Sequence, residues 1–395
     1  MNLLSIINRK EHLFQDDLNH IEKDLHEIIC NSSILVIGGA GSIGQAVSIE
    51  ICKRKPRLLH VVDLSENNLV ELVRNIRSSI GYFSGEFKTF ALDCGSKEFE
   101  ALSINQSYDF IFNLSALKHV RSEKDPFTLM RLIQVNIFNT IKTLRLFSSK
   151  NHLKNYFSVS TDKASNPVSM MGASKKIMEN YLHRESKSQK VSMARFANVA
   201  FSDGSLLHGF NQRILKRQPI SAPNDIKRYF ITPQESGELC LISGLKGENR
   251  DIFFPKLNEK LDLIKFSEIA KEYLKSLNYD VVECDSEEDA RNNAEALISE
   301  NKWPCYFFKS DTSGEKDFEE FYTSDETLDL DKYKSIGVIK NEIDYDEKLL
   351  NKFELEVNRL FEQKAWKKND LIKLFKEFLP NFNHLETGKS LDEKM

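Results

Sequence analysis

The sequence lacks the residue patterns that mark a metal-binding or disulfide-rich protein. Only six of its 395 residues are cysteines, and they lie far apart, at Cys30, Cys52, Cys94, Cys240, Cys284 and Cys305. No two of them have the close spacing of a metal-binding motif, and the nine histidines contain no HExxH pattern. We therefore expect neither an exported disulfide framework nor a metal site. The cysteines are interpreted as reduced thiols of a cytoplasmic protein.

Long apolar runs and a surplus of one charge are also missing. No segment approaches the roughly 20 apolar residues that a membrane-spanning helix needs. The opening residues, MNLLSIINRKEHLF, are interrupted by charge after a few apolar positions, which is untypical of a signal peptide. With 59 acidic and 55 basic residues, the net charge is -4. The balance of charge gives no reason to expect a nucleic acid or a membrane as partner.

The chain does contain a regular alternation of short apolar runs and longer helical patterns. After an amphipathic helical segment over residues 1–30, strands are predicted at 33–38, 58–63, 86–93, 109–113, 155–160 and 191–196. The clearest helical patterns between them cover 125–149 and 169–187. Strands that alternate with helices indicate βαβ units, so we predict a Rossmann-type, doubly wound parallel α/β sheet.

A glycine-rich turn follows the first predicted strand. The segment GGAGSIG places glycines at 38, 41 and 44, directly before a helical pattern. A pyrophosphate can approach backbone amides only where side chains are absent, and the next helix adds the partial positive charge of its N-terminus. The context predicts a dinucleotide site whose turn is formed by Gly38, Gly41, Ser42, Ile43 and Gly44.

Two acidic residues end the next two predicted strands. Asp63 lies 19 residues after Gly44, where a carboxylate accepts hydrogen bonds from the adenosine ribose and repels a 2′-phosphate. This position favours NAD over NADP as the cofactor. Asp93 ends the third strand and is predicted to meet the adenine edge.

Three further polar stretches follow the later strands, at the sheet edge where open α/β sheets bind ligands. They are NLSALKH at 113–119, STDK at 160–163 and MGASK at 171–175. With GGAGSIG, VNIFNT, RFANV and IKRYFIT, these stretches resemble the extended short-chain dehydrogenase/reductase superfamily. More narrowly, they resemble its polysaccharide-biosynthesis branch of UDP-N-acetylglucosamine 4,6-dehydratases, over residues from about 10 to 245. DTSGEKDFEEF at 311–321 resembles an extension found in some members.

The resemblance implies a catalytic set. Lys175 matches the lysine of the superfamily's Tyr-x-x-x-Lys pair, but Met171 stands at the tyrosine position and cannot carry a proton. Asp162 is assigned as the acid for the 6-hydroxyl and Lys163 as the base at C5, while Thr161 holds the 4-hydroxyl. Lys163 can serve as a base only if burial or a neighbouring cation lowers its pKa. The base for the 4-hydroxyl stays open between Lys163 and a bound water.

The resemblance also implies binding residues. Lys175, Ser115 and Ala116 would lie beside the cofactor, and Asn198 and Arg228 would hold the nucleotide-sugar diphosphate. Lys118 could approach the substrate or the pyrophosphate. The implied organisation is a helical segment (1–30), an NAD-binding domain (31–200), a nucleotide-sugar-binding part (201–330) and a helical C-terminal extension (331–395).

Several functions remain open on the sequence. The first is conversion of UDP-N-acetylglucosamine to a UDP-4-keto-6-deoxy-N-acetylhexosamine for bacterial surface glycans, in a homo-oligomer. A GDP-sugar 4,6-dehydratase and a nucleotide-sugar 4- or 5-epimerase are alternatives, although the missing tyrosine argues against a 4-epimerase. A non-catalytic NAD-binding module is the last alternative, and retention of Thr161, Asp162, Lys163 and Lys175 argues against it.

Overall fold

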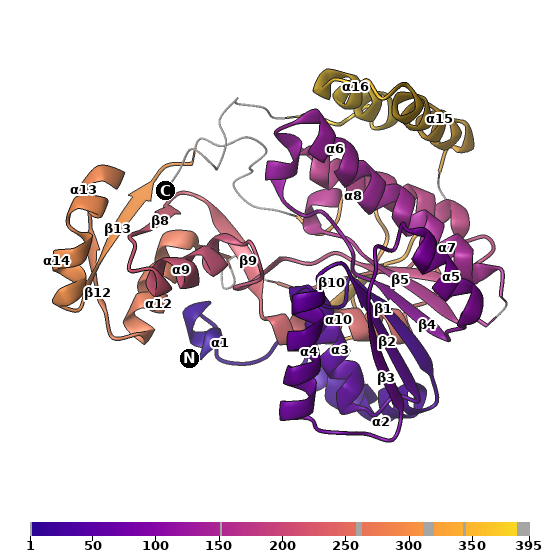
Figure 1. Cartoon of the computed structure of the whole chain (residues 1–395), viewed down its shortest axis with the longest axis horizontal. Coiled ribbons are helices and arrows are strands. Elements are labelled where there is room, and N and C mark those ends of the chain that lie inside the picture. The colour runs from indigo at the N-terminus through magenta and orange to yellow at the C-terminus, as the bar shows by residue number, and fades with distance from the viewer. Residues whose placement is uncertain (1, 151, 258–262, 311–319, 343–344, 385–395) are drawn as a thin grey trace.

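The computed structural model describes residues 2–150, 152–257, 263–310, 320–342 and 345–384. The chain forms a large lobe around one long sheet and a small lobe beside it (Figure 1). Of the segment that resembles a family extension, 311–321, only Glu320 and Phe321 are among the described residues. No described helix is long and apolar enough to cross a membrane.

The large lobe contains a nine-stranded sheet in the order β14-β15-β10-β6-β5-β4-β1-β2-β3. From β3 to β10 all neighbours pair in parallel, whereas β15 is antiparallel to β10 and β14 is antiparallel to β15. All six predicted strands are present, and the doubly wound α/β fold is confirmed. The bounds are β1 (Ser33–Ile37), β2 (Leu58–Asp63), β3 (Glu86–Ala91), β4 (Phe110–Asn113), β5 (Asn155–Val159), β6 (Val191–Ala194), β10 (Ile252–Pro255), β14 (Leu328–Asp329) and β15 (Ile336–Ile339).

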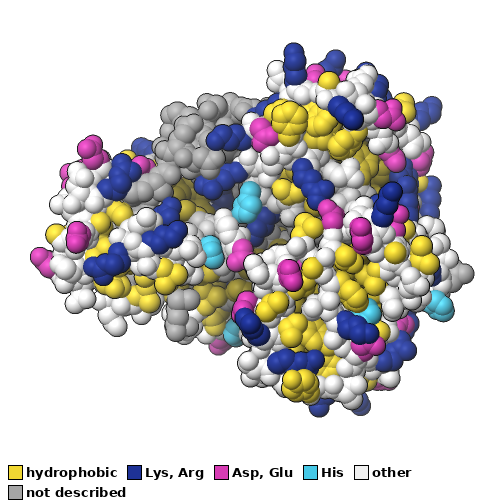
Figure 2. Space-filling model, viewed as in Figure 1, with side chains coloured by type: hydrophobic (Ala, Val, Ile, Leu, Met, Phe, Trp, Pro, Cys, Tyr) yellow, Lys and Arg dark blue, Asp and Glu magenta, His cyan; other side chains and the backbone are white. Residues whose placement is uncertain are grey.

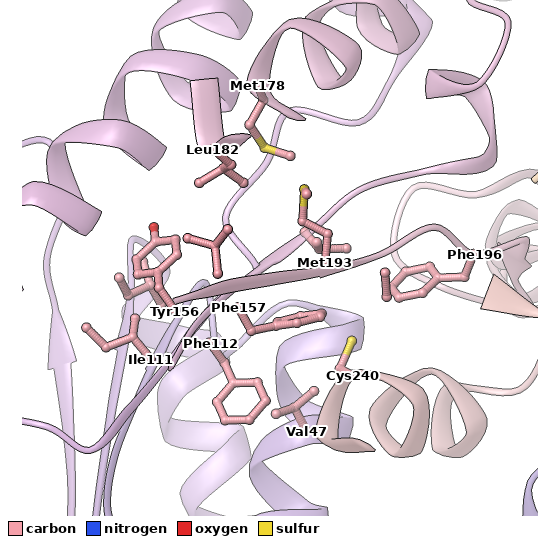
Figure 3. Packing of buried hydrophobic residues seen from close by; sticks show 14 of the residues in the cluster. Val47, Ile111, Phe112, Tyr156, Phe157, Met178, Leu182, Met193, Phe196 and Cys240 are labelled. Atoms are coloured by element: carbon pink, nitrogen blue, oxygen red, sulfur yellow. The ribbon is translucent and has the colours of Figure 1, made fainter. Parts of the chain in front are cut away.

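Helices cover both faces of this sheet because its central strands are apolar on both sides. One face carries α2 (Gln15–Cys30), α3 (Ser42–Lys53), α4 (Glu66–Ser79) and α10 (Pro233–Lys246). The other carries α5 (Lys97–Asn105), α6 (Pro126–Ile133), α7 (Thr140–Ser148) and α8 (Met170–Glu185). Figure 3 shows the resulting core, with Val47 and Cys240 below the sheet and Met178 and Leu182 above it.

The predicted helix over 125–149 is interrupted. A π-helical segment, η2 (Gln134–Asn139), lies between α6 and α7. Such π segments are rare and are often found at functional sites. The segment coincides with the VNIFNT motif, and the side chain of its Asn136 turns toward the loop after β4.

The small lobe has its own apolar core, separate from that of the large lobe. Its parallel sheet contains β12 (Asp280–Glu283), β13 (Lys302–Phe308) and β8 (Ile220–Pro223). A second sheet lies between the lobes and contains β11 (Leu263–Lys265), β9 (Lys227–Ile231) and β7 (Asn198–Val199). The helices of the small lobe are α1 (Leu3–Ile6), α9 (Leu206–Leu215), α12 (Phe266–Ser276), α13 (Glu287–Asn292) and α14 (Ala294–Ser299).

The chain crosses between the lobes more often than the predicted boundaries imply. Strands β10, β14 and β15 all join the large sheet, so this sheet does not end at residue 200. The segment after 331 is also not wholly helical, because it contributes β15 before α15 (Glu347–Gln363) and α16 (Lys368–Phe378). The predicted helical segment over 1–30 is likewise divided between α1 in the small lobe and α2 in the large lobe. Short strands depend on distant partners, which a local pattern does not reveal.

Candidate active site

The glycine turn between β1 and α3 has the geometry of a phosphate cradle. Gly38 has a φ of +72°, and a Cβ there would lie 2.7 Å from the amide nitrogen of Ser115. A Cβ on Gly44 would lie 2.1 Å from the carbonyl oxygen of Gly38. Only glycine fits at either position, and α3 begins at Ser42 directly after the turn. The backbone is therefore shaped to receive a dinucleotide pyrophosphate at a helix N-terminus.

Asp63, at the end of β2, is hydrogen-bonded to the backbone of this turn. Its carboxylate accepts hydrogen bonds from the amides of Ala40 and Ser65, each at 2.9 Å. Its position at the end of β2 agrees with the predicted ribose contact. Asp93 follows β3 and pairs with Arg131 at 2.8 Å. Its contact with an adenine stays a prediction.

The turn after β5 brings the predicted acid and base into contact. The side chain of Thr161, the amide of Lys163 and the ammonium of Lys163 all donate to Oδ1 of Asp162, at 2.9, 2.9 and 3.1 Å. Asp162 is buried, with 2% of its surface exposed, whereas Lys163 is partly exposed. This arrangement fixes the carboxylate and leaves the lysine side chain accessible to a ligand.

Helix α8 packs closely against that turn. A Cβ on Gly172 would lie 2.5 Å from the carbonyl oxygen of Lys163, so the two backbones almost touch. Lys175, one turn further along, donates from Nζ to the carbonyl of Val159 at 3.0 Å. Its burial lowers its pKa to about 8. The structure thus brings Lys175 to the end of β5, next to the Thr161–Lys163 turn.

Met171 occupies the first turn of α8 and is buried. Its amide donates to the carboxylate of Glu123 at 2.9 Å. A thioether neither donates nor accepts a proton near neutral pH. The acid–base group that a tyrosine would supply at this position must therefore come from another residue or from water.

The loop after β4 carries the predicted residues Ser115, Ala116 and Lys118. The hydroxyl of Ser115 donates to the side chain of Asn113 at 2.8 Å. Desolvation by the surrounding protein lowers the pKa of Lys118, and the nearby Asp203 carboxylate opposes that shift. Figure 2 shows Lys, Arg and His side chains gathered in the hollow between the two lobes.

The two residues that are predicted to bind the diphosphate of the substrate lie on neighbouring strands. Asn198 on β7 pairs in register with Phe230 of β9, so Arg228, two residues earlier on β9, is on the same face of the sheet. Arg228 is buried. Among the described residues, the buried Nδ2 of Asn198 has no hydrogen-bond partner. A buried donor without a partner is unfavourable unless a ligand supplies one, which agrees with a binding role.

Asn136 and Glu123 are among the residues that support this site and that sequence reasoning missed. Asn136, in the π segment, bonds to both the amide and the carbonyl of Leu117 and to the hydroxyl of Ser174. It therefore ties the loop after β4 to α8. Glu123 holds the amide of Met171, as described above. The VNIFNT motif was a usable signal for Asn136, whereas no local pattern pointed to Glu123.

A family model described as "Polysaccharide biosynthesis protein" matches residues 34–341. The chain belongs to this family. The match confirms the resemblance to the polysaccharide-biosynthesis branch of the extended short-chain dehydrogenase/reductases.

Individual relatives of known name are identical to this chain at about a quarter of the aligned residues. The chain is 27% identical over 237 residues to UDP-N-acetylglucosamine 4,6-dehydratase (inverting) of Campylobacter jejuni, covering 57% of this chain and 67% of that protein. It is 26% identical over 242 residues to the capsular polysaccharide biosynthesis protein CapD of Staphylococcus aureus, covering 60% of this chain and only 40% of CapD. UDP-glucose 4-epimerases are also similar. These relatives support an enzyme of the nucleotide-sugar dehydratase or epimerase kind.

The fold has solved counterparts. The structure of Pen from Bacillus thuringiensis superposes with a TM-score of 0.65 at 20% identity, over 85% of this chain and 98% of Pen. Other structures of similar fold were solved with NAD bound. At this identity the likeness establishes the fold, and the cofactor site is supported by the glycine turn itself.

Proposed function

We propose that the protein is a 4,6-dehydratase that converts UDP-N-acetylglucosamine to a UDP-4-keto-6-deoxy-N-acetylhexosamine for bacterial surface glycans, in the cytoplasm and as a homo-oligomer. The observation that carries the proposal is the contact between Asp162 and Lys163 beside buried Lys175. Dehydration needs an acid and a base next to one another over the sugar, and this pair provides both.

The cofactor of this reaction would be NAD, held by the glycine turn and Asp63, with Ser115, Ala116 and Lys175 beside it. When bound, it supplies reversible hydride transfer at C4 and then at C6 of the sugar. The diphosphate would be held by Asn198 and Arg228, with Lys118 at the edge of the site.

The proposed roles require a neutral amine on Lys163 and a protonated carboxyl on Asp162, so the proton of the ion pair would have to move from one group to the other when substrate is bound. The ammonium of Lys163 donates to Oδ1 of Asp162 at 3.1 Å. Transfer of that proton along the hydrogen bond leaves a neutral amine and a protonated carboxyl. The amine then removes the C5 proton, and the carboxyl protonates the departing 6-hydroxyl. Thr161 would hold the 4-hydroxyl. Its proton would pass to a bound water, or through Lys163 to solvent before that amine acts at C5, because Met171 cannot accept it. After water has left, the Lys163 ammonium would return a proton to C5, and the proton released from the 4-hydroxyl would restore the starting ion pair.

Epimerisation is the second candidate because epimerases are among the relatives. A 4-epimerase of this superfamily normally relies on a tyrosine where this chain has Met171. Epimerisation at C5 would use the same base, Lys163, with the proton returned to the other face of the sugar. A GDP sugar would satisfy the same acid and base.

The first experiment is to incubate the purified protein with UDP-N-acetylglucosamine, and separately with a GDP-sugar, without added NAD. We expect the UDP sugar to lose one water, measured by mass spectrometry. Water loss from the GDP sugar alone would show that the substrate carries guanine instead of uracil. An unchanged mass with an altered proton NMR spectrum would indicate an epimerase. No turnover of either sugar would contradict both enzymatic functions.

Isotope exchange separates the two roles. In D2O, Asp162→Asn should lose water elimination by at least ~100-fold, because the 6-hydroxyl has no acid. The variant should still exchange the C5 proton of recovered substrate, because without the carboxylate Lys163 can give its proton to solvent and act as the base. Lys163→Met should lose both reactions, because no base reaches C5. Water loss that survives in Asp162→Asn would overturn the assignment of the acid.

A further inference from the structure

A segment far along the chain contacts the catalytic turn. Residues 320–326 come from the region after the small lobe, yet they pack beside β5, β6 and α8 of the large lobe. Their contacts reach residues on both sides of the Thr161–Lys163 turn. Glu320 and Phe321 end the DTSGEKDFEEF stretch that resembles a family extension, whereas residues 322–326 belong to no motif that the sequence analysis identified.

The centre of these contacts is Arg195, which follows β6 and is fully buried. On one side its guanidinium donates to both carboxylate oxygens of Glu179 on α8, at 2.9 and 2.7 Å. On the other side it donates to both oxygens of Glu326, at 2.8 Å each. Two forked pairs on one guanidinium fix its position and orientation much more tightly than a single contact.

Glu179 passes this constraint to the catalytic residues. Its Oε1 accepts a hydrogen bond of 2.6 Å from the hydroxyl of Ser160, which directly precedes Thr161. Glu179 also lies one helical turn after Lys175, and its negative charge opposes the effect of burial on the pKa of that lysine. The carboxylate therefore faces both halves of the catalytic set.

The same segment holds the other end of the turn. The hydroxyl of Ser165 donates to the carbonyl of Glu320 at 2.6 Å, and the side chain of Asn166 donates to the carboxylate of Glu320 at 2.9 Å. The carbonyl of Phe321 accepts from Arg195 at 3.0 Å. Residues 320–326 thus brace the loop of 160–166 at its beginning and at its end.

We propose that Glu326 is a positioning residue for the reaction, acting through Arg195, Glu179 and Ser160 on the turn that carries the acid and the base. The inference rests on the proposed function, because it concerns the same Asp162 and Lys163. It assigns the distant segment 320–326 to the catalytic machinery. Without Glu326, one half of a buried guanidinium has no carboxylate, and Arg195 and Glu179 are free to shift. A small displacement of an acid or base lowers the rate of the chemical step more than substrate binding.

The test compares Glu326→Ala and Glu326→Gln with Asp325→Asn in the full chain. Asp325 is the adjacent, exposed carboxylate, and its replacement removes the same charge without touching Arg195. We expect kcat, per cofactor-loaded protein, to fall about ten- to a hundredfold in Glu326→Ala while KM changes by less than about twofold. Glu326→Gln keeps an acceptor for Arg195 and should be intermediate, and Asp325→Asn should match the wild type.

A second readout does not depend on turnover. Amide hydrogen exchange of the peptide containing residues 160–166 should become faster in Glu326→Ala than in Asp325→Asn. If the wild type processes no nucleotide sugar, the proposed function fails, and exchange alone then decides whether Glu326 braces the turn. Unchanged exchange in Glu326→Ala would overturn the inference. The inference would also be overturned if Glu326→Ala loses activity only because less of the protein is folded, while kcat per cofactor-loaded protein is unchanged.

Discussion

At the scale of single residues, Lys175 shows a conflict between stability and function. Its ammonium is buried at the end of β5, where it donates to the carbonyl of Val159 and, among the residues that the structure describes, pairs with no carboxylate. Burial lowers the pKa of this lysine from 10.5 to about 8. The buried ammonium therefore destabilises the folded protein, although the proposed reaction uses its charge.

Replacing the charge should therefore stabilise the protein. We expect Lys175→Met to raise the free energy of unfolding of cofactor-free protein by about 2 kcal/mol at pH 7, which is about 3.4 kcal/mol from the pKa shift reduced by about 1 kcal/mol for the lost hydrogen bond. The same change should abolish activity. Between pH 8 and 10.5 the unfolded wild type keeps a proton that the folded wild type has released, so the stability of the wild type rises with pH. The advantage of the variant should shrink over that range.

Urea unfolding at pH 7 and at pH 9.5 measures this difference. Lys373→Met, at an exposed position on α16, is the matched control and should change stability little at either pH. An advantage of Lys175→Met that is the same at both pH values would show that packing, and not charge, is its cause.

The residues of the site were predicted to different degrees. Gly38, Gly44 and Asp63 lie next to their strands in sequence, so a local pattern was enough to predict a cofactor-binding role for them. Glu179 and Arg195 were not found, because their roles depend on each other and on a residue more than a hundred positions away. An isolated arginine in RFANV has no pattern that distinguishes a buried ion pair from a surface charge.

At the scale of elements, the strands of the large sheet and the helical C-terminal segment were predicted, whereas the choice of elements against which that segment packs was not. β1 to β6 are confirmed. Five of these strands are mostly buried, whereas β3, at the edge of the sheet, contains only exposed and partly buried residues in alternation. The two helices α15 and α16 lie against α6 and α8 (Figure 1). The ring of Phe353 on α15 is 6.3 Å from that of Phe138 and 6.5 Å from that of Tyr181, between ring centroids.

Removal of α15 and α16 should expose this apolar face without breaking the sheet. A chain that ends at residue 345 keeps β15, so we expect it to fold but to form larger particles than the full chain, as measured by size-exclusion chromatography with light scattering. A chain that ends at residue 329 loses β15 from the sheet and should not give soluble protein. Identical particle sizes for the full chain and the chain ending at 345 would contradict this role of the two helices.

Two point variants on α15 give a control that keeps the chain length. Phe353 is buried, whereas Leu355 on the same helix is 68% exposed. Phe353→Ala should lower the free energy of unfolding by about 3 kcal/mol, and Leu355→Ala by less than about 0.5 kcal/mol.

At the scale of the whole molecule, the first residues connect the two lobes. Ile6 and Ile7 are buried in the core of the small lobe, and Phe14 is buried in the core of the large lobe. Between them, Arg9 reaches the fully buried Glu235 at the start of α10, with one N–O distance of 2.9 Å. The sequence showed an amphipathic N-terminal segment but not its division between two cores, because the partners of α1 come from residues 200–305.

The ion pair between Arg9 and Glu235 should be a main support of this connection. Arg9→Met leaves the carboxylate of Glu235 buried without its cation, so we expect a loss of about 3 kcal/mol in the free energy of unfolding, measured by urea denaturation. Lys10→Met, at the exposed neighbouring position, should change it little. In the double variant Arg9→Met, Glu235→Gln, most of the loss should be recovered, because glutamine can still accept from the amide of Thr232 but carries no charge. If the double variant is as unstable as Arg9→Met alone, the arginine acts through its packing, and the charge of Glu235 is not the reason that the segment is held in place.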